Sequence, residues 1–194
     1  MPTLVEVEQK ALGCLRCPLH QGRTTVVFGE GNAHAQLMIV GEGPGRDEDL
    51  QGRPFVGRSG KLLDRLLAEE MGLERNAVYI ANVVKCRPPG NRDPLPDEIK
   101  ACNPWLQAQV ELIEPKVLLT LGNFSTKLLL NTSDGITKTR GRVYPYGSSG
   151  AVLVPTYHPA AALRGGGEVL AGMRADFVRA KEAIGPGRPT MVRP

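Results

Sequence analysis

Short apolar runs that alternate with helical patterns constrain the fold of this chain most strongly. The runs lie at residues 36–40, 78–81, 116–121 and 151–155. Apolar residues recur at helical spacing over 59–70 and about 96–113, and again over 168–184 after the last run. Strands that alternate with helices form parallel sheets. The sequence therefore predicts an α/β fold, with a single-domain three-layer α/β/α arrangement around a central, mainly parallel four-stranded sheet.

Chemically useful residues follow three of the predicted strands. The glycine-rich stretch GEGPG follows the first run, Asn82 follows the second, and His158 follows the fourth. Ligands of open α/β sheets bind outside the carboxyl ends of the strands. We therefore expect these residues to converge on one crevice.

Length and composition are those of one globular domain. The chain has 194 residues, 41% of them hydrophobic, which suffices for one core. We expect a domain over 1–184 and a disordered tail over 185–194. No apolar run approaches the roughly 18 residues that span a bilayer, and the first residues lack the pattern of a signal peptide. The prediction is a cytoplasmic monomer without a membrane partner. Its net charge of +4 permits a nucleic-acid partner without requiring one.

The four cysteines indicate a ligand site. A helical pattern over 3–12 ends at Gly13 and delivers Cys14 and Cys17, while Cys86 and Cys102 come much later. Thiols of a cytosolic protein stay reduced, so ligation is favoured over disulfides. By ligand count, four thiolates suit zinc and an iron–sulfur cluster equally well. Zinc ribbons, however, usually have two close pairs.

A proline interrupts the helical pattern that contains Cys102. Pro104 follows Asn103, and proline suits the first position of a helix better than its interior. The sequence therefore predicts that Cys102 lies at a junction between two helices.

Several motifs in order resemble the family 4 uracil-DNA glycosylases. They are RTTVVFGEGN at 23–32, GEGPGRDED at 41–49, GRPFVGRSG at 52–60, NVVKCRPPGNRDPLPDE at 82–98 and YHPAAALR at 157–164. With the cysteine layout, the resemblance runs over roughly residues 10–180. It implies a hydrolase of base excision repair that flips deoxyuridine out of DNA, releases uracil and leaves an abasic site. It also implies a structural [4Fe-4S] cluster on Cys14, Cys17, Cys86 and Cys102, with zinc as the alternative.

The resemblance implies two catalytic residues. Glu42 would orient the attacking water and stabilise positive charge on the sugar. His158 would donate a hydrogen bond to uracil O2 as the base departs with negative charge.

Four more residues would bind the base. Gly43 would let the backbone approach uracil, and Phe55 would stack on it. The Asn82 amide offers a donor and an acceptor that match O4 and N3–H of uracil. Glu48 would crowd the C5 edge and so exclude thymine.

The resemblance also implies contacts to DNA. From its pattern alone, the segment 160–164 is an ordinary helical turn. The resemblance instead implies an insertion loop in which Leu163 wedges into the base stack and Arg164 contacts phosphate. Ala160 stands where related enzymes often have serine, which weakens one backbone contact to phosphate. Further basic residues would line the DNA backbone: Lys85, Arg87, Lys138, Arg140 and Arg142.

Two other classes of protein compete with this interpretation. A nucleic-acid-binding scaffold would use the thiols only for folding and would release no uracil. A redox protein would cycle the Cys14–Cys17 pair as a disulfide, against which the two additional cysteines argue.

Overall fold

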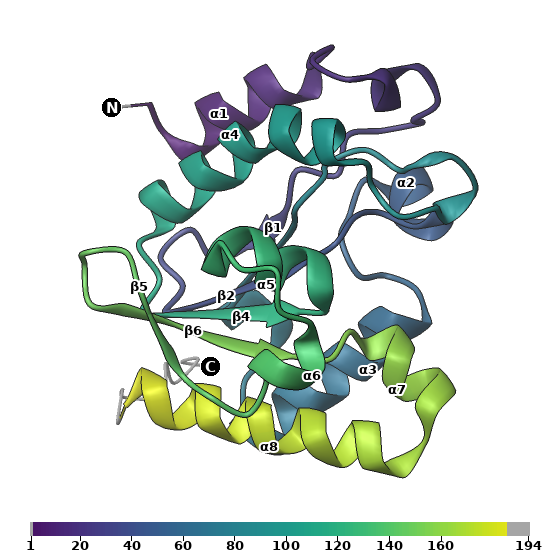
Figure 1. Cartoon of the computed structure of the whole chain (residues 1–194). Coiled ribbons are helices and arrows are strands. Elements are labelled where there is room, and N and C mark those ends of the chain that lie inside the picture. The colour runs from purple at the N-terminus through teal and green to yellow at the C-terminus, as the bar shows by residue number, and fades with distance from the viewer. Residues whose placement is uncertain (1, 186–194) are drawn as a thin grey trace, which may run out of the picture.

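The computed structural model describes residues 2–185, which form a six-stranded sheet between two layers of helices (Figure 1). The strands are β1 (Glu30–Gly31), β2 (Leu37–Gly41), β3 (Tyr79–Asn82), β4 (Val117–Leu121), β5 (Tyr144–Tyr146) and β6 (Ala151–Thr156). The α-helices are α1 (Leu4–Leu12), α2 (Arg46–Gln51), α3 (Arg58–Leu66), α4 (Pro96–Ile113), α5 (Asn123–Leu130), α6 (Ile136–Thr139), α7 (Pro159–Gly165) and α8 (Gly167–Ile184). Short turns of other helix types lie at Pro18–Gln21, Leu67–Met71, Arg75–Ala77 and Pro89–Asn91.

The sheet has the order β1-β3-β2-β4-β6-β5. Its four central strands are parallel and correspond to the four apolar runs of the sequence, so the predicted α/β class is confirmed. The two edge strands, β1 and β5, are antiparallel to their neighbours and were not predicted. They have only two and three residues, which is too short to show an apolar pattern.

Both faces of the sheet are covered, which explains why its four central strands are mostly apolar. In β2, Met38 and Val40 join the core beneath α1 and α4, whereas Leu37 and Ile39 join the core beneath α3 and α8. Figure 1 shows these layers, with α1 and α4 side by side above the sheet and α8 below it.

Helix α1 carries the first cysteines to the sheet. Thr3 caps it by accepting from the Glu6 backbone, and the Glu6 carboxylate accepts in return from the Thr3 backbone. Val7 and Ala11 are buried against α4. The helix ends before Gly13, as predicted, and Cys14 follows.

The prediction of a break at Pro104 is wrong. Helix α4 continues from Pro96 to Ile113 with Pro104 inside it, so Cys102 lies within a helix and not at a junction. Proline removes one backbone hydrogen bond. On both sides of it α4 buries side chains, among them Cys102, Leu106 and Ile113, and this packing holds the helix together.

Residues 160–164 belong to helix α7. The helical turn indicated by their pattern is therefore confirmed, and the loop implied by the resemblance is not formed. The tail predicted at 185–194 lies, apart from Gly185, outside the described residues. Within residues 2–185, no helix has both the length and the apolarity needed to cross a membrane.

Candidate active site and thiol cavity

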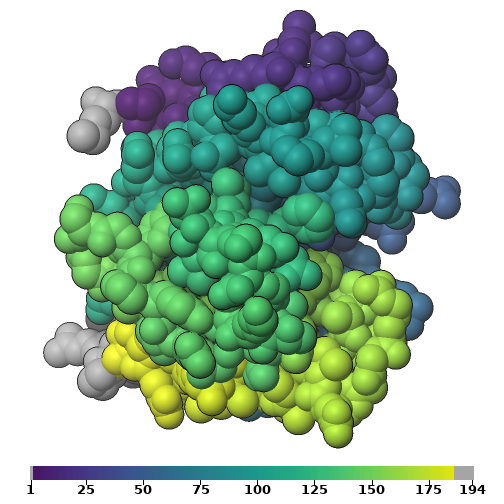
Figure 2. Space-filling model, in the orientation of Figure 1, coloured from purple at the N-terminus to yellow at the C-terminus, as the bar shows by residue number. Residues whose placement is uncertain are grey.

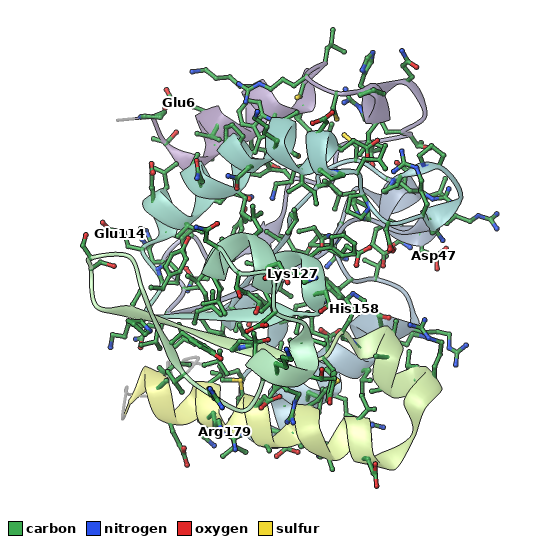
Figure 3. The ribbon with its side chains drawn as sticks, viewed as in Figure 1. Glu6, Asp47, Glu114, Lys127, His158 and Arg179 are labelled. Carbon is green, nitrogen blue, oxygen red and sulfur yellow. The ribbon has the colours of Figure 1, made fainter. Side chains whose placement is uncertain are left out.

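A cleft of about 840 Å³ opens at the carboxyl ends of the parallel strands. Figure 2 shows this hollow between the teal segment that follows β3 and the yellow-green helix α7. Apart from the basic residues expected along the DNA backbone, eight residues were predicted to act in catalysis or to bind base or DNA. Seven of them line the cleft: Glu42, Gly43, Glu48, Phe55, Asn82, His158 and Arg164. The eighth, Leu163, lies on α7 with 42% of its surface exposed and is not part of the lining. In Figure 3, His158 and Asp47 mark this side of the molecule.

Asn82 ends strand β3 deep in the cleft. Only 2% of it is exposed, and its Oδ1 has no hydrogen-bond partner among the described residues. Gly41 is its register neighbour on β2. A β-carbon at Gly41 would lie 2.4 Å from Asn82 Oδ1 and 2.5 Å from Phe55 Cζ, so only glycine leaves room for both side chains. Buried polar groups are normally paired. The unpaired Asn82 Oδ1 is therefore available to a ligand that enters the cleft.

Phe55 forms an aromatic wall next to Asn82. Its backbone has a φ of 52°, a left-handed conformation that non-glycine residues seldom adopt. The loop packs so closely on α3 that a β-carbon at Gly60 would lie 1.7 Å from the Phe55 carbonyl oxygen. The Phe55 and His158 rings are 5.8 Å apart between centroids and tilted by 32°. A planar base can thus meet a ring face beside a hydrogen-bonding amide.

Glu48 holds the Phe55 loop from one side. Its Oε1 accepts hydrogen bonds from the backbone N–H groups of Val56 at 3.0 Å and Gly57 at 3.1 Å. Its Oε2 accepts from Gly45 at 3.1 Å. The carboxylate therefore fixes the loop, which the sequence did not indicate, while its predicted role against thymine stays a prediction.

Arg75 holds the same loop from the other side and was not singled out in the sequence. Its guanidinium donates to the carbonyl oxygens of Phe55, at 3.1 Å, and of Pro54. It also pairs with Glu30 at 2.6 Å and Asp64 at 3.0 Å. These contacts secure the left-handed backbone of Phe55. No motif signals such a role, because the contacts go to backbone atoms about 20 residues away in sequence.

His158 caps helix α7 and is held in one tautomer. Its Nδ1 accepts a hydrogen bond from the Ala160 backbone N–H at 3.1 Å, so the proton of the neutral ring is on Nε2. Burial and, to a smaller extent, the positive charge of Arg164 lower the pKa of His158 to about 4, against the opposing effect of Glu48. At neutral pH, His158 is therefore an uncharged donor through Nε2–H.

Glu42 directly follows β2 at the floor of the cleft. Burial and, to a smaller extent, the negative charge of Asp93 raise the pKa of the Glu42 carboxyl to about 7. Asp93 lines the same cleft and was not predicted to matter. The next residue, Gly43, lies so close to Val84 that a β-carbon would come within 2.7 Å of Cγ2. Glu42 thus exchanges a proton close to neutral pH.

All four cysteines line a second cavity, between α1, α4 and the loop after β3. They are free thiols, and N–H groups point at three of the sulfurs. Arg23 donates to Cys86 Sγ at 3.4 Å, Trp105 Nε1 to Cys14 Sγ at 3.4 Å, and the Lys85 backbone N–H to Cys102 Sγ at 3.3 Å.

The thiols of this cavity are the residues that could hold a metal ion or a cluster. Within residues 2–185, no three Cys, His, Asp or Glu side chains are arranged to hold a metal ion. Tetrahedral zinc needs four thiolates about 2.3 Å from one point. A cluster instead takes each thiolate at a separate iron, and N–H donors to the sulfurs are a normal part of its environment. Four thiols that line one cavity, with N–H donors to three of the sulfurs, are a donor set that either group accepts.

Two of the basic residues predicted to line DNA have partners within the protein. Lys85 is 1% exposed and cannot reach a phosphate. Arg140 pairs with buried Asp176 at 3.0 Å and lies over the Tyr157 ring at 4.9 Å. The prediction for Lys85 is wrong, because interior acceptors hold its ammonium. The side chain of Arg140 is 21% exposed, so its contact with DNA stays a prediction. Lys138 and Arg142 are exposed.

Comparison with known proteins places the chain in one group. The sequence family described as "Uracil DNA glycosylase superfamily" matches residues 28–182. A type-4 uracil-DNA glycosylase of Sulfurisphaera tokodaii is 46% identical over 198 residues, which is 98% of this chain and 90% of the relative. Those of Saccharolobus solfataricus and Thermotoga maritima are 44% and 48% identical, over 95% and 81% of this chain and 88% and 82% of the relatives.

Proposed function

Because the chain belongs to the type-4 family of the uracil DNA glycosylase superfamily, we propose that it removes uracil from DNA by hydrolysing the bond between base and sugar. One observation carries this proposal. The buried Asn82 amide has an unpartnered Oδ1 in a cleft that it shares with Phe55, Glu42 and His158. That set provides a base reader, a stacking face, a carboxylate and a neutral donor, all of which the reaction requires.

The proposed reaction divides between two residues. The bond between uracil N1 and sugar C1′ breaks with its electron pair going to uracil, and His158 Nε2–H stabilises the charge that develops on O2. Water adds to C1′ and loses a proton to the Glu42 carboxylate, which also stabilises the positive sugar. The uracil anion takes up a proton from solvent as it is released, and Glu42 returns its proton to solvent. The products are free uracil and an abasic site.

The direct test is incubation of the purified protein with an oligonucleotide that contains one uracil. Alkali should then cleave the strand at that position. Matched oligonucleotides with cytosine or thymine should stay intact. Binding of all three strands without cleavage would instead support the nucleic-acid-binding scaffold.

Two residues of helix α7 at the cleft are placed to contact DNA. Arg164 lines the cleft, and Leu163 is exposed beside it on the same helix. We propose that Leu163 fills the space left by the flipped nucleotide and that Arg164 binds phosphate. The wedge is then presented by helix α7.

The rate of the chemical step should depend on pH through the ionisation of the Glu42 carboxyl. Only the ionised carboxylate can accept the proton of water, so the chemical rate should rise with pH and level off above about 7. Below that pH it should fall about tenfold per unit, as for one essential ionisation. Asp93→Asn removes a charge that raises the pKa of Glu42, so its acidic limb should move to lower pH. Single-turnover rates across the pH range measure this. If the fall in rate at low pH is unmoved in Asp93→Asn and persists in Glu42→Gln, a group other than Glu42 causes it.

We further propose that Cys14, Cys17, Cys86 and Cys102 hold a [4Fe-4S] cluster. When bound, the cluster fastens the segment after α1 to α4 and to the loop after β3, and it takes no part in breaking the glycosidic bond. This proposal rests on the shared cavity and on the N–H donors to the sulfurs.

Anaerobically purified protein should be brown and contain about four irons and four sulfides per chain. Cys102→Ser should lose most of the iron and unfold at a lower temperature, because a ligand that joins α4 to the site is gone. Ala101→Ser is the matched control, since Ala101 lines the same cavity without a thiol and should keep its iron. A colourless, fully active protein with stoichiometric zinc would show that the four cysteines bind zinc and not a cluster.

A further inference from the structure

Lys85 is a buried lysine that lines the thiol cavity and contacts the main chain of Asn82, which lines the candidate active site. It is 1% exposed and lies in the segment between β3 and α4, directly before Cys86. Among the described residues it forms no salt bridge with a carboxylate, although a buried ammonium needs polar partners. Its hydrogen bonds therefore show what it does.

The ammonium joins the end of β3 to helix α4. Lys85 Nζ donates to the Asn82 carbonyl oxygen at 2.8 Å and to Gln109 Oε1 at 2.5 Å. It also lies 5.7 Å from the centroid of the Phe28 ring. All the side chains involved are nearly fully buried, so these contacts are shielded from water.

Gln109 is itself held in one orientation. Its Nε2 donates to the Phe28 carbonyl oxygen at 2.9 Å and to the Tyr79 hydroxyl at 3.1 Å, so Oε1 must face Lys85. Cys102 lies two helical turns earlier on the same face of α4 and accepts from the Lys85 backbone N–H. Helix α4 thus holds Lys85 through both its main chain and its side chain.

We propose that Lys85 is a positioning residue for base recognition and acts through Asn82. Asn82 is the last residue of β3, and Lys85 satisfies its buried carbonyl from below. Without the ammonium, that carbonyl would be left unpaired, and the peptide would turn to find another donor. The side-chain amide would turn with it, out of register with the base. This inference rests on the proposed function, because it assumes that Asn82 reads uracil.

A double-mutant cycle tests the proposal. Lys85→Met keeps the length of the side chain and removes its charge and donors. It should lower the single-turnover rate of uracil release about 10²-fold, the effect of a small misplacement of a reacting or binding group. In an Asn82→Ala background the same change should alter the rate by no more than about twofold, because the two residues act in series. Lys116→Met is the charge-matched control, since Lys116 is exposed at the opposite ends of the strands, and it should keep the wild-type rate.

The outcomes separate the possible failures. A wild-type protein that releases no uracil contradicts the proposed function. An active wild type with equal losses for Lys85→Met in both backgrounds shows a general structural role and overturns the proposal, as does an unchanged rate. Iron content and unfolding temperature are measured for each variant. If Lys85→Met does not fold, Lys85→Met with Gln109→Leu removes the acceptor left unpaired; if that variant does not fold either, Lys85 serves folding and the proposal is wrong.

Discussion

Replacing Asn82 with aspartate should lower the rate of uracil release about 10⁴-fold, the scale on which a site built for hydrogen bonding rejects a mispaired partner. The change removes the N–H donor to uracil O4 and places an oxygen against it. Because Asn82 is buried, water cannot compensate for the mismatch. The ratio of uracil to cytosine cleavage should fall with the rate, since cytosine carries an amino group where uracil carries O4.

Single-turnover rates on uracil and cytosine oligonucleotides measure this effect. Asn123→Asp is the matched control because Asn123 lines the same cleft, and its side-chain oxygen only accepts from the Ile136 backbone, which a carboxylate can also do. It adds the same charge and should change the rate little. If Asn82→Asp and Asn123→Asp behave alike, added charge and not base recognition explains the loss.

Replacing His158 with alanine should slow the chemical step about 10²–10³-fold, the usual cost of one preorganised donor to a developing anion. Affinity for uracil-containing DNA should change much less, because the charge on O2 develops only in the transition state. The pKa of about 4 adds a second expectation. The factor lost should be the same from about pH 6 to about pH 8, because His158 stays neutral throughout that range.

Single-turnover rates and equilibrium binding, measured on the same duplex, separate these effects. His34→Ala is the control, since His34 is exposed and outside the cleft, and it should match the wild type in both measurements. A His158→Ala variant that loses binding and rate to the same degree would point to a structural histidine.

The sequence predicted the place of the site well because that place follows from topology. Apolar runs locate the parallel strands, and side chains that follow such strands must meet at one edge of the sheet. Glu42, Asn82 and His158 do line one cleft there. What each residue contributes to catalysis remains a proposal.

Protonation could not be predicted from the sequence, because it depends on burial and on neighbours that are distant along the chain. A histidine is the usual candidate for titration near neutral pH. Here burial holds His158 neutral and gives the near-neutral pKa to Glu42, with help from Asp93. The same limitation explains the error at Lys85, since a lysine in a basic loop looks like a phosphate ligand until its interior partners are known.

The two edge strands bear on how the protein behaves at high concentration. An exposed strand edge offers unpaired backbone groups to other chains and can start aggregation. At one edge β1 has only two residues, and at the other β5 has three with Pro145 at its centre, which has no N–H to donate. Each edge is therefore a poor template for strand addition. The edges of the sheet thus resist strand pairing with other copies of the chain, while the cleft at the carboxyl ends of the strands stays open.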